Sequence, residues 1–307
     1  MKKITIFCSV IVLLITLSAC GNDQFDASQT INVYTRDTSS GTRDGFMKGI
    51  DFPDASGTDS VLVEGFSTND NAGIMNAMTI DRYGIGYISM ASVNDTIKAL
   101  NLNDIEPTVE NVNLDTYELK RPFVYMLRLE NDYENTTMFE LSKAFETFIL
   151  SEEGSDVILD QGAISYTNKG TFNNLVDNHT ICEQDNSDIT LNIGGSNSVT
   201  EVAEALSASF VGRCGNVNVS HNHTGSSDAF KRTQGDEKDS ANAIDFGFSS
   251  RHFRGEELDN DESLRGQLAW DAIVVIVHQD NPVDSLTQSQ VKKIYSGDVT
   301  SWDELID

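Results

Sequence analysis

Short apolar runs alternate with amphipathic stretches along most of this chain. The runs at 31–33, 121–126 and 270–277 are rich in β-branched and aromatic residues, which is typical of buried strands. Apolar residues recur at helical spacing over 138–150, and we expect another helix over 93–100. Strands that alternate with helices predict an α/β fold with largely parallel sheets.

Capping residues mark several helix starts. Ser151 precedes an acidic first turn, and Thr287 precedes the amphipathic stretch 288–295. Between them, the stretch 168–188 is rich in Asn, Asp, Thr and Gly and shows no periodicity. This composition predicts a linker.

Four strand-to-helix turns are rich in serine, threonine and glycine. The first contains Ser40, Gly41 and Thr42 and lies just after Arg36; the others lie at 194–198, 224–227 and 247–251. In open α/β sheets, ligands bind beyond the carboxyl ends of the strands, where such turns meet. Helix N-termini, hydroxyl donors and a guanidinium suit a tetrahedral oxyanion. One such turn alone could be an ordinary capped turn, but four together predict an anion-binding cleft.

Charge narrows the choice of partners. The formal charge of −27 argues against nucleic acid and anionic membrane surfaces. It also means that an anion site must work through local dipoles and hydrogen bonds, because the overall field repels the ligand. At 307 residues, 39% of them hydrophobic, the chain is long enough for two lobes with separate cores.

The N-terminus is typical of a targeting segment. Two lysines precede an apolar run at 4–17 that is too short for a conventional spanning helix. The run ends in Leu-Ser-Ala-Cys20, which resembles the bacterial lipobox, so we expect a lipid on Cys20 and a polar tether over 21–29. An uncleaved anchor with an incidental cysteine is the alternative. Outside the cytoplasm, Cys182 and Cys214 could pair or stay as free thiols.

Catalysis and metal binding are weaker alternatives. Ser40 or Ser226 could be a nucleophile beside a histidine base, but neither lies in a Gly-x-Ser-x-Gly turn. The candidate bases are His221, His223, His252 and His278. His221 and His223 would share one face of a strand and could bind a metal, but no third ligand lies close in the sequence. We therefore predict no enzyme, no metal and no cofactor.

Taken together, these segments resemble the substrate-binding lipoproteins of bacterial phosphate ABC transporters, which have a two-lobed periplasmic-binding-protein fold of type II. The matching segments are 36–43, 84–89, 121–123 and 150–154 in the first half, and 195–198, 224–227, 245–251 and 280–302 in the second. The resemblance implies a lipid-anchored monomer on the extracytoplasmic face of the cell membrane. It would capture inorganic phosphate and deliver it to an ABC permease. Binding of another oxyanion, or a surface adhesin or sensor role, is the alternative.

The resemblance also implies a site. The expected phosphate ligands are Arg36, Ser40, Gly41, Thr42, Asn197, Ser198, Ser226 and Ser250. Ser250 stands where some relatives have an aspartate that accepts the phosphate proton, and Thr38 stands where an acidic residue is common. We expect Asp44 or Asp228 to replace that acceptor. A buried carboxylate would reject sulfate and accept protonated phosphate.

The order of the segments differs from the usual order in this family. There, the segment that corresponds to 195–198 comes first, and the segment that corresponds to 40–43 follows the one that corresponds to Trp302. This predicts a circular permutant, with 168–188 joining the original termini and new termini near Thr30 and Asp307. One lobe would then comprise 121–277 and the other 30–120 with 278–307, and a hinge would lie at the two apolar strands. The alternative is a spliced or truncated chain that pairs with a second copy.

Overall fold

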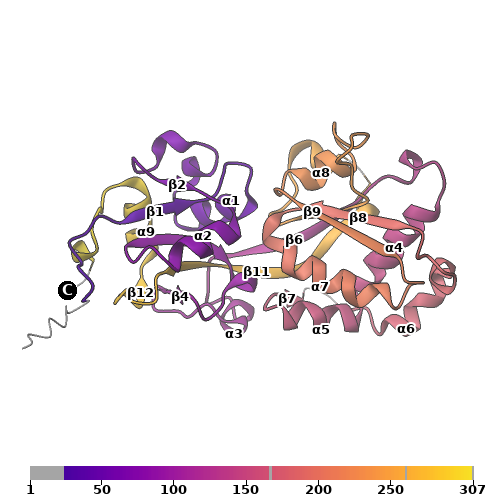
Figure 1. Ribbon diagram of the computed structural model, residues 1–307, viewed down its shortest axis with the longest axis horizontal. Coiled ribbons are helices and arrows are strands. Elements are labelled where there is room, and N and C mark those ends of the chain that lie inside the picture. The colour runs from indigo at the N-terminus through magenta and orange to yellow at the C-terminus, as the bar shows by residue number, and fades with distance from the viewer. Residues whose placement is uncertain (1–23, 166–167, 260, 306–307) are drawn as a thin grey trace, which may run out of the picture.

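The computed structural model describes residues 24–165, 168–259 and 261–305. Two lobes lie side by side and are joined by two long strands, β6 (Lys120–Leu127) and β11 (Arg265–Val277) (Figure 1). The first lobe contains β1 (Asn32–Thr35), α1 (Gly41–Gly49), β2 (Ser67–Thr68), α2 (Asn71–Met78), β3 (Gly84–Ser89), β4 (Lys98–Ala99), β5 (Asn101–Leu102), α3 (Val109–Asn113), β12 (Ser285–Leu286) and α9 (Gln288–Ser296). The second contains α4 (Thr137–Ile149), α5 (Glu152–Asp160), β7 (Ile164–Ser165), α6 (Phe172–Leu175), β8 (Thr190–Gly195), α7 (Thr200–Val211), β9 (Asn218–His223), α8 (Asp228–Thr233) and β10 (Phe246–Ser249).

One mixed sheet runs through both lobes in the order β2-β1-β3-β11-β6-β10-β8-β9. The outer strands are parallel: β1 pairs in parallel with β2 and β3, and β8 with β10 and β9. The two crossing strands run antiparallel to each other and to β3 and β10. They must oppose each other, because β6 takes the chain from the first lobe to the second and β11 brings it back. The prediction of parallel pairing therefore describes the outer strands only.

Each lobe has its own hydrophobic core. In the first, Phe46 stacks on Tyr87 with ring centroids 3.8 Å apart, and Trp302 from the C-terminal segment is fully buried in the same cluster. In the second, Phe145 contacts Phe210 and, on β10, Phe246. Aromatic side chains bury large apolar areas, so two clusters of this kind allow the lobes to be stable on either side of a thin connection.

Two predictions about local structure were wrong. Instead of a helix over 93–100, the chain makes a 3-10 turn at Met90–Ser92 and then enters β4. The Asn94 side chain accepts hydrogen bonds from the backbone and hydroxyl of Thr96, which stabilises a turn, and β4 then pairs with β11.

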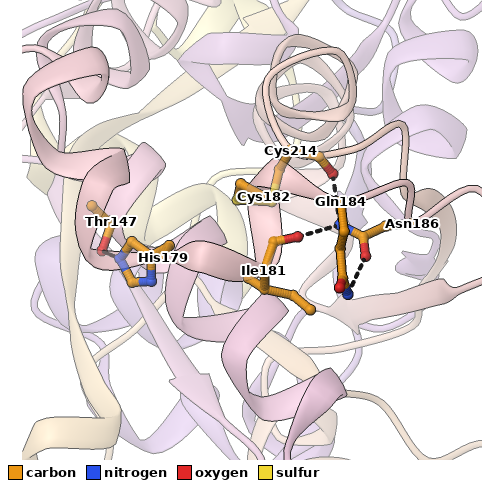
Figure 2. Close-up of a disulfide and its surroundings, with 7 residues drawn as sticks. All are labelled: Thr147, His179, Ile181, Cys182, Gln184, Asn186 and Cys214. Atoms are coloured by element: carbon orange, nitrogen blue, oxygen red, sulfur yellow. Dashed lines mark hydrogen bonds between the residues drawn. A yellow bond between two sulfur atoms is a disulfide. The ribbon is translucent and has the colours of Figure 1, made fainter.

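The stretch 168–188 is more ordered than a linker. It contains α6 and two 3-10 turns, and Phe172 packs edge-on against Phe148 with ring centroids 5.4 Å apart. A disulfide joins Cys182 to Cys214 just beyond the end of α7, and the Asn186 side chain donates to the carbonyl of Cys214 beside it (Figure 2). The two cysteines are therefore paired, and the stretch is attached to the second core.

Both ends of the described chain lie in the first lobe (Figure 1). The amide of Ile31 donates to the carbonyl of Thr300 at 2.8 Å. The amide of Asp303 donates to the carbonyl of Ala27, also at 2.8 Å. The predicted signal segment and Cys20 lie outside the described residues. None of the helices in the described ranges is both long and apolar enough to cross a membrane.

Candidate anion-binding site

The serine-rich turns of the two lobes meet where the lobes face each other. Ser40 is the N-cap of α1 and accepts from the amide of Arg43 at 3.4 Å, which places Gly41 and Thr42 in the first turn of that helix. Gly41 lies so close to the second lobe that a Cβ atom there would be 2.5 Å from the Ser226 hydroxyl. Only glycine allows the first turn of α1 to approach the other lobe in this way.

Arg36 links the lobes directly. Its Nη1 donates to Thr42 Oγ1 at 3.1 Å and to Ser198 Oγ at 3.3 Å, and its Nη2 donates to Asn197 Oδ1 across the gap between lobes. Asn71 Oδ1, at the start of α2, is also within 3.4 Å of Nη1. Thus the guanidinium is held entirely by neutral oxygen atoms.

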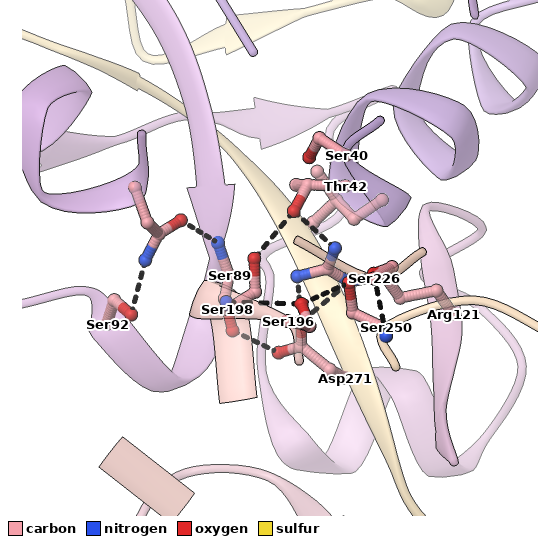
Figure 3. A network of polar contacts seen from close by, with 12 residues as sticks. Ser40, Thr42, Ser89, Ser92, Arg121, Ser196, Ser198, Ser226, Ser250 and Asp271 are labelled. Carbon is pink, nitrogen blue, oxygen red and sulfur yellow. Dashed lines mark hydrogen bonds and ion pairs between the residues drawn. The ribbon is translucent and has the colours of Figure 1, made fainter. Parts of the chain in front are cut away.

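A second group of hydroxyls lies on the turns of the second lobe. Ser196 donates to Ser250 Oγ at 2.9 Å, and Ser226 and Ser250 share a hydrogen bond of 2.9 Å (Figure 3). The Ser250 amide donates to Ser226 Oγ at 3.1 Å. All three serines are buried, and their hydroxyls hydrogen-bond to one another, as buried polar groups do.

The charge of Arg36 lacks a counter-charge. The side chain is almost fully buried, its Nε has no hydrogen-bond partner, and within the described ranges no carboxylate forms an ion pair with it. Burial lowers the pKa of Arg36 to about 10. Removing an unpaired charge from water costs several kcal/mol. A negatively charged ligand beside Arg36 would offset this cost.

Proton counting shows that the hydroxyl of Ser198, next to Arg36, is left with a hydrogen to donate. Thr42 Oγ1 accepts from both Arg36 and Arg121, which uses its two lone pairs, so its own hydrogen must be donated. That hydrogen faces Ser198 Oγ at 2.7 Å. Ser198 in turn accepts from Thr42 and Arg36, so its hydrogen is left to donate. The arrangement suits a ligand whose atoms accept hydrogen bonds.

Comparison with known proteins agrees with this chemistry. Over 298 residues the chain is 30% identical to phosphate-binding protein PstS 2 of Streptococcus agalactiae, covering 94% of this chain and 92% of that protein. This chain belongs to the PstS family of phosphate-binding proteins. Residues 180–307 match the model of the PBP superfamily domain. Protein SphX of Synechococcus elongatus is 33% identical over 120 residues, which cover 35% of this chain and 33% of that protein.

The fold is shared with a solved structure. The phosphate-binding protein of a phosphate ABC transporter from Streptococcus pneumoniae superposes with a TM-score of 0.60 at 23% identity, covering 90% of this chain and 99% of that one. The predicted family and the predicted periplasmic-binding-protein fold are thus confirmed.

The eight residues predicted as ligands lie on the facing turns of the two lobes. Thr42 and Ser198 meet, and Asn197 meets Arg36; Ser226 and Ser250 meet each other beside Gly41. The Ser40 side chain, in contrast, caps α1. Their role as phosphate ligands stays a prediction.

The geometry does not support the two predicted proton acceptors. Asp44 pairs with Lys48 at 2.9 Å and with Arg254 at 3.6 Å, and Asp228 accepts from the Thr224 hydroxyl. Both carboxylates are engaged by other groups, and among the described residues neither makes a contact with the site hydroxyls. Asp44 nevertheless lines a pocket with Gly41 and Ser250, and the role of either carboxylate as a proton acceptor stays a prediction.

Sequence inspection missed Arg121 and Asp271. Arg121 Nε and Nη2 donate to one oxygen of Asp271 at 3.0 and 2.8 Å, and Ser89 donates to the other at 2.9 Å (Figure 3). Burial lowers the pKa of Arg121 and raises that of Asp271, and the attraction between the two opposes both shifts. The sequence did contain a signal for this pair. Arg121 and Asp271 carry opposite charges, and each lies inside one of the apolar runs that form the crossing strands.

The histidine pair supports a turn of the site. His221 Nδ1 and His223 Nε2 lie 3.1 Å apart, and His223 Nδ1 lies 3.1 Å from the carbonyl oxygen of Ser196. Ser207 Oγ lies 2.9 Å from His221 Nε2. Across the described ranges, no three His, Cys, Asp or Glu side chains are placed to hold a metal ion. The pair therefore supports the Ser196 turn, which carries Asn197.

Proposed function

We propose that this chain is an extracytoplasmic, lipid-anchored protein that captures inorganic phosphate between its lobes and delivers it to an ABC permease. The observation that carries the proposal is the buried guanidinium of Arg36, held only by neutral groups within the described ranges. Phosphate would supply a negative charge opposite this guanidinium, and its oxygens would accept from the hydroxyl of Ser198. The names of the relatives support phosphate as the ligand.

The proposed ligands bind from both lobes. They are Arg36, Ser40, Gly41, Thr42, Asn197, Ser198, Ser226 and Ser250. Phosphate would take over the contacts that Arg36 now makes to Asn197 and Ser198 across the gap. A ligand that binds both lobes at once favours their closed arrangement, with motion at β6 and β11.

Calorimetric titration of the chain without its first twenty residues tests the proposal, since every described element lies after residue 23. Arg36→Gln should weaken phosphate binding by about 2–5 kcal/mol, because a buried charge-assisted contact is lost. Arg213→Gln is the matched control: that arginine is exposed, and its guanidinium lies over the ring of Phe148 in the second core. An absence of binding by the unchanged protein would refute the proposal. Equal affinities for the unchanged protein and Arg36→Gln would remove this guanidinium from the site.

A second candidate ligand is another tetrahedral oxyanion, such as sulfate. The observation that favours it is that no described carboxylate contacts the hydroxyls of Thr42, Ser198, Ser226 or Ser250. Without such an acceptor, a protonated oxyanion loses its advantage over a fully ionised one. The same titration with sulfate decides between them: tight sulfate binding would broaden the function, and its absence would require an acceptor.

We also propose the circular permutation, with lobes at 121–277 and at 30–120 plus 278–307. The hydrogen bonds between segments 27–31 and 300–303 support an arrangement in which both ends of the described chain lie together in one lobe. The match along nearly all of the S. agalactiae protein supports an order of segments shared with that relative. A match restricted to 120 residues of SphX is what a permuted chain would give against the usual order. Light scattering should find a monomer; an obligate dimer would favour the alternative of a spliced or truncated chain that pairs with a second copy.

A further inference from the structure

A second buried guanidinium lies beside the first. Arg121 is only 2% exposed, and its Nη1 donates to Thr42 Oγ1, the same oxygen that accepts from Arg36 at 3.1 Å. Two like charges on one hydroxyl repel each other strongly where water is excluded. Their proximity contributes to the lowered pKa of Arg36, for which burial is the larger cause.

Asp271 neutralises only one of these charges. Its Oδ2 accepts from two nitrogens of Arg121, and its Oδ1 accepts from Ser89, so both carboxylate oxygens are occupied. The carboxylate is fully buried. The cluster of Arg36, Arg121 and Asp271 therefore carries a net positive charge. Three of the five N–H bonds of Arg121 are used by Thr42 and Asp271, which leaves two for a ligand.

Arg121 also borders open space. A pocket of about 470 Å³ is lined by Arg121 together with Gly41 and Ser250, which belong to the candidate site. Lys48 and Arg254 line the same pocket, and so do the carboxylates of Asp44 and Glu118; Asp44 pairs with both Lys48 and Arg254. An anion in the candidate site can therefore lie next to the Arg121 guanidinium without displacing the Asp271 pair.

We propose that Arg121 is a second anion-binding residue, and that Arg36 and Arg121 together make the site prefer a dianion to a monoanion. The inference rests on the proposed phosphate-binding function and deepens it. A second guanidinium that faces the ligand adds more attraction for HPO₄²⁻ than for H₂PO₄⁻, because the Coulomb energy grows with the charge of the anion. Asp271 orients the Arg121 fork and partly offsets its charge.

A purely structural role for the pair makes different predictions. The Arg121–Asp271 contact joins β6 to β11 at the crossing between lobes, so it could serve only to hold these strands together. In that case Asp271→Asn and the double variant Arg121→Gln/Asp271→Asn would both weaken the crossing and would affect binding in the same direction. If Arg121 binds the anion, the two variants act in opposite directions, because only the first leaves the positive charge in place.

The experiment is calorimetric titration with inorganic phosphate below and above its second ionisation. Asp271→Asn should bind the dianion more tightly than the unchanged protein, and Arg121→Gln/Asp271→Asn should bind it at least about tenfold more weakly. The ratio of dianion to monoanion affinity should rise in the first variant and fall in the second. Ser89→Ala is the control: it removes one hydrogen bond to Asp271, keeps both guanidiniums and should leave the ratio unchanged.

Circular dichroism confirms that each variant is folded. If the double variant does not fold, Asp271→Asn decides alone: a lower dianion preference than that of the unchanged protein overturns the assignment. Weaker binding in both variants with an unchanged ratio also overturns it, because that result is the signature of a structural pair. Failure of the unchanged protein to bind phosphate at either pH is a different result, which removes the proposed function and this inference with it.

Discussion

Protonation of the histidine pair should destabilise the fold and the site together. His223 is mostly buried, and burial, aided by the neighbouring His221, lowers its pKa from 6.5 to about 4. The folded protein keeps His223 neutral, whereas the unfolded chain takes up a proton below pH 6.5. The stability contributed by the neutral ring is therefore complete above pH 6.5 and is lost as the pH falls towards 4. A difference of this size corresponds to at most about 3 kcal/mol.

The surroundings determine how much of this loss is observed. The carboxylates of Glu201 and Glu204 on α7 and of Asp70 before α2 line a pocket with the pair, and Arg232 on α8 also acts on His223. The carboxylate of Glu204 acts to raise the pKa of His221, against the effect of burial. The guanidinium of Arg232 acts to lower the pKa of His223 further. Because other groups also titrate in this range, the informative quantity is a difference between variants.

His223→Asn provides that difference. The amide can still donate towards the carbonyl of Ser196 but takes up no proton, so its free energy of unfolding should fall less between pH 6.5 and about 4 than that of the unchanged protein. Urea unfolding at several pH values measures both curves. His252→Gln removes an exposed histidine and should follow the unchanged protein. Parallel curves for the unchanged protein and His223→Asn would refute the reasoning.

Three other changes have expected outcomes. Cys20→Ala should abolish incorporation of a palmitate analogue in cells, and persistent labelling would rule out Cys20 as the lipid site. Replacing Cys182 and Cys214 by serine should lower the free energy of unfolding by about 2–4 kcal/mol, measured in urea, and leave phosphate affinity unchanged because the disulfide lies in the second core. Gly41→Ala should weaken phosphate binding in calorimetry, because its Cβ would lie 2.5 Å from the Ser226 hydroxyl; undiminished affinity would show that the lobes need not approach this closely.

Short-range features were predictable because the groups that cause them are adjacent in the chain. Thr287 caps α9 by accepting from the amide of Gln290, and Ser151 caps α5 by accepting from that of Gly154, as their positions before amphipathic stretches predicted. Ser40 caps α1 in the same way. The helix predicted over 93–100 failed for an equally local reason, since the Asn94 side chain stabilises a turn that the apolar pattern does not reveal.

The candidate site was predictable only in part. The serine-rich turns are visible in the sequence because each follows a strand, and strands of a parallel sheet bring such turns to one edge. Arg36 was visible for the same reason. That its charge would be buried among neutral groups was not, because burial depends on how closely the lobes approach. The two carboxylates predicted as proton acceptors are occupied by neighbours that chain order alone does not identify.

The sequence by itself determined the family, the alternation of strands and helices and the turns that carry hydroxyl groups, because these depend on composition and on neighbours a few residues apart. Only the tertiary structure decided that Arg121 and Asp271, 150 residues apart, form a buried pair beside Thr42. It also decided that Cys182 pairs with Cys214 and that 168–188 is ordered. Contacts of this range depend on the free energy of the whole fold, in which burial of the surrounding apolar groups outweighs the cost of bringing distant segments together.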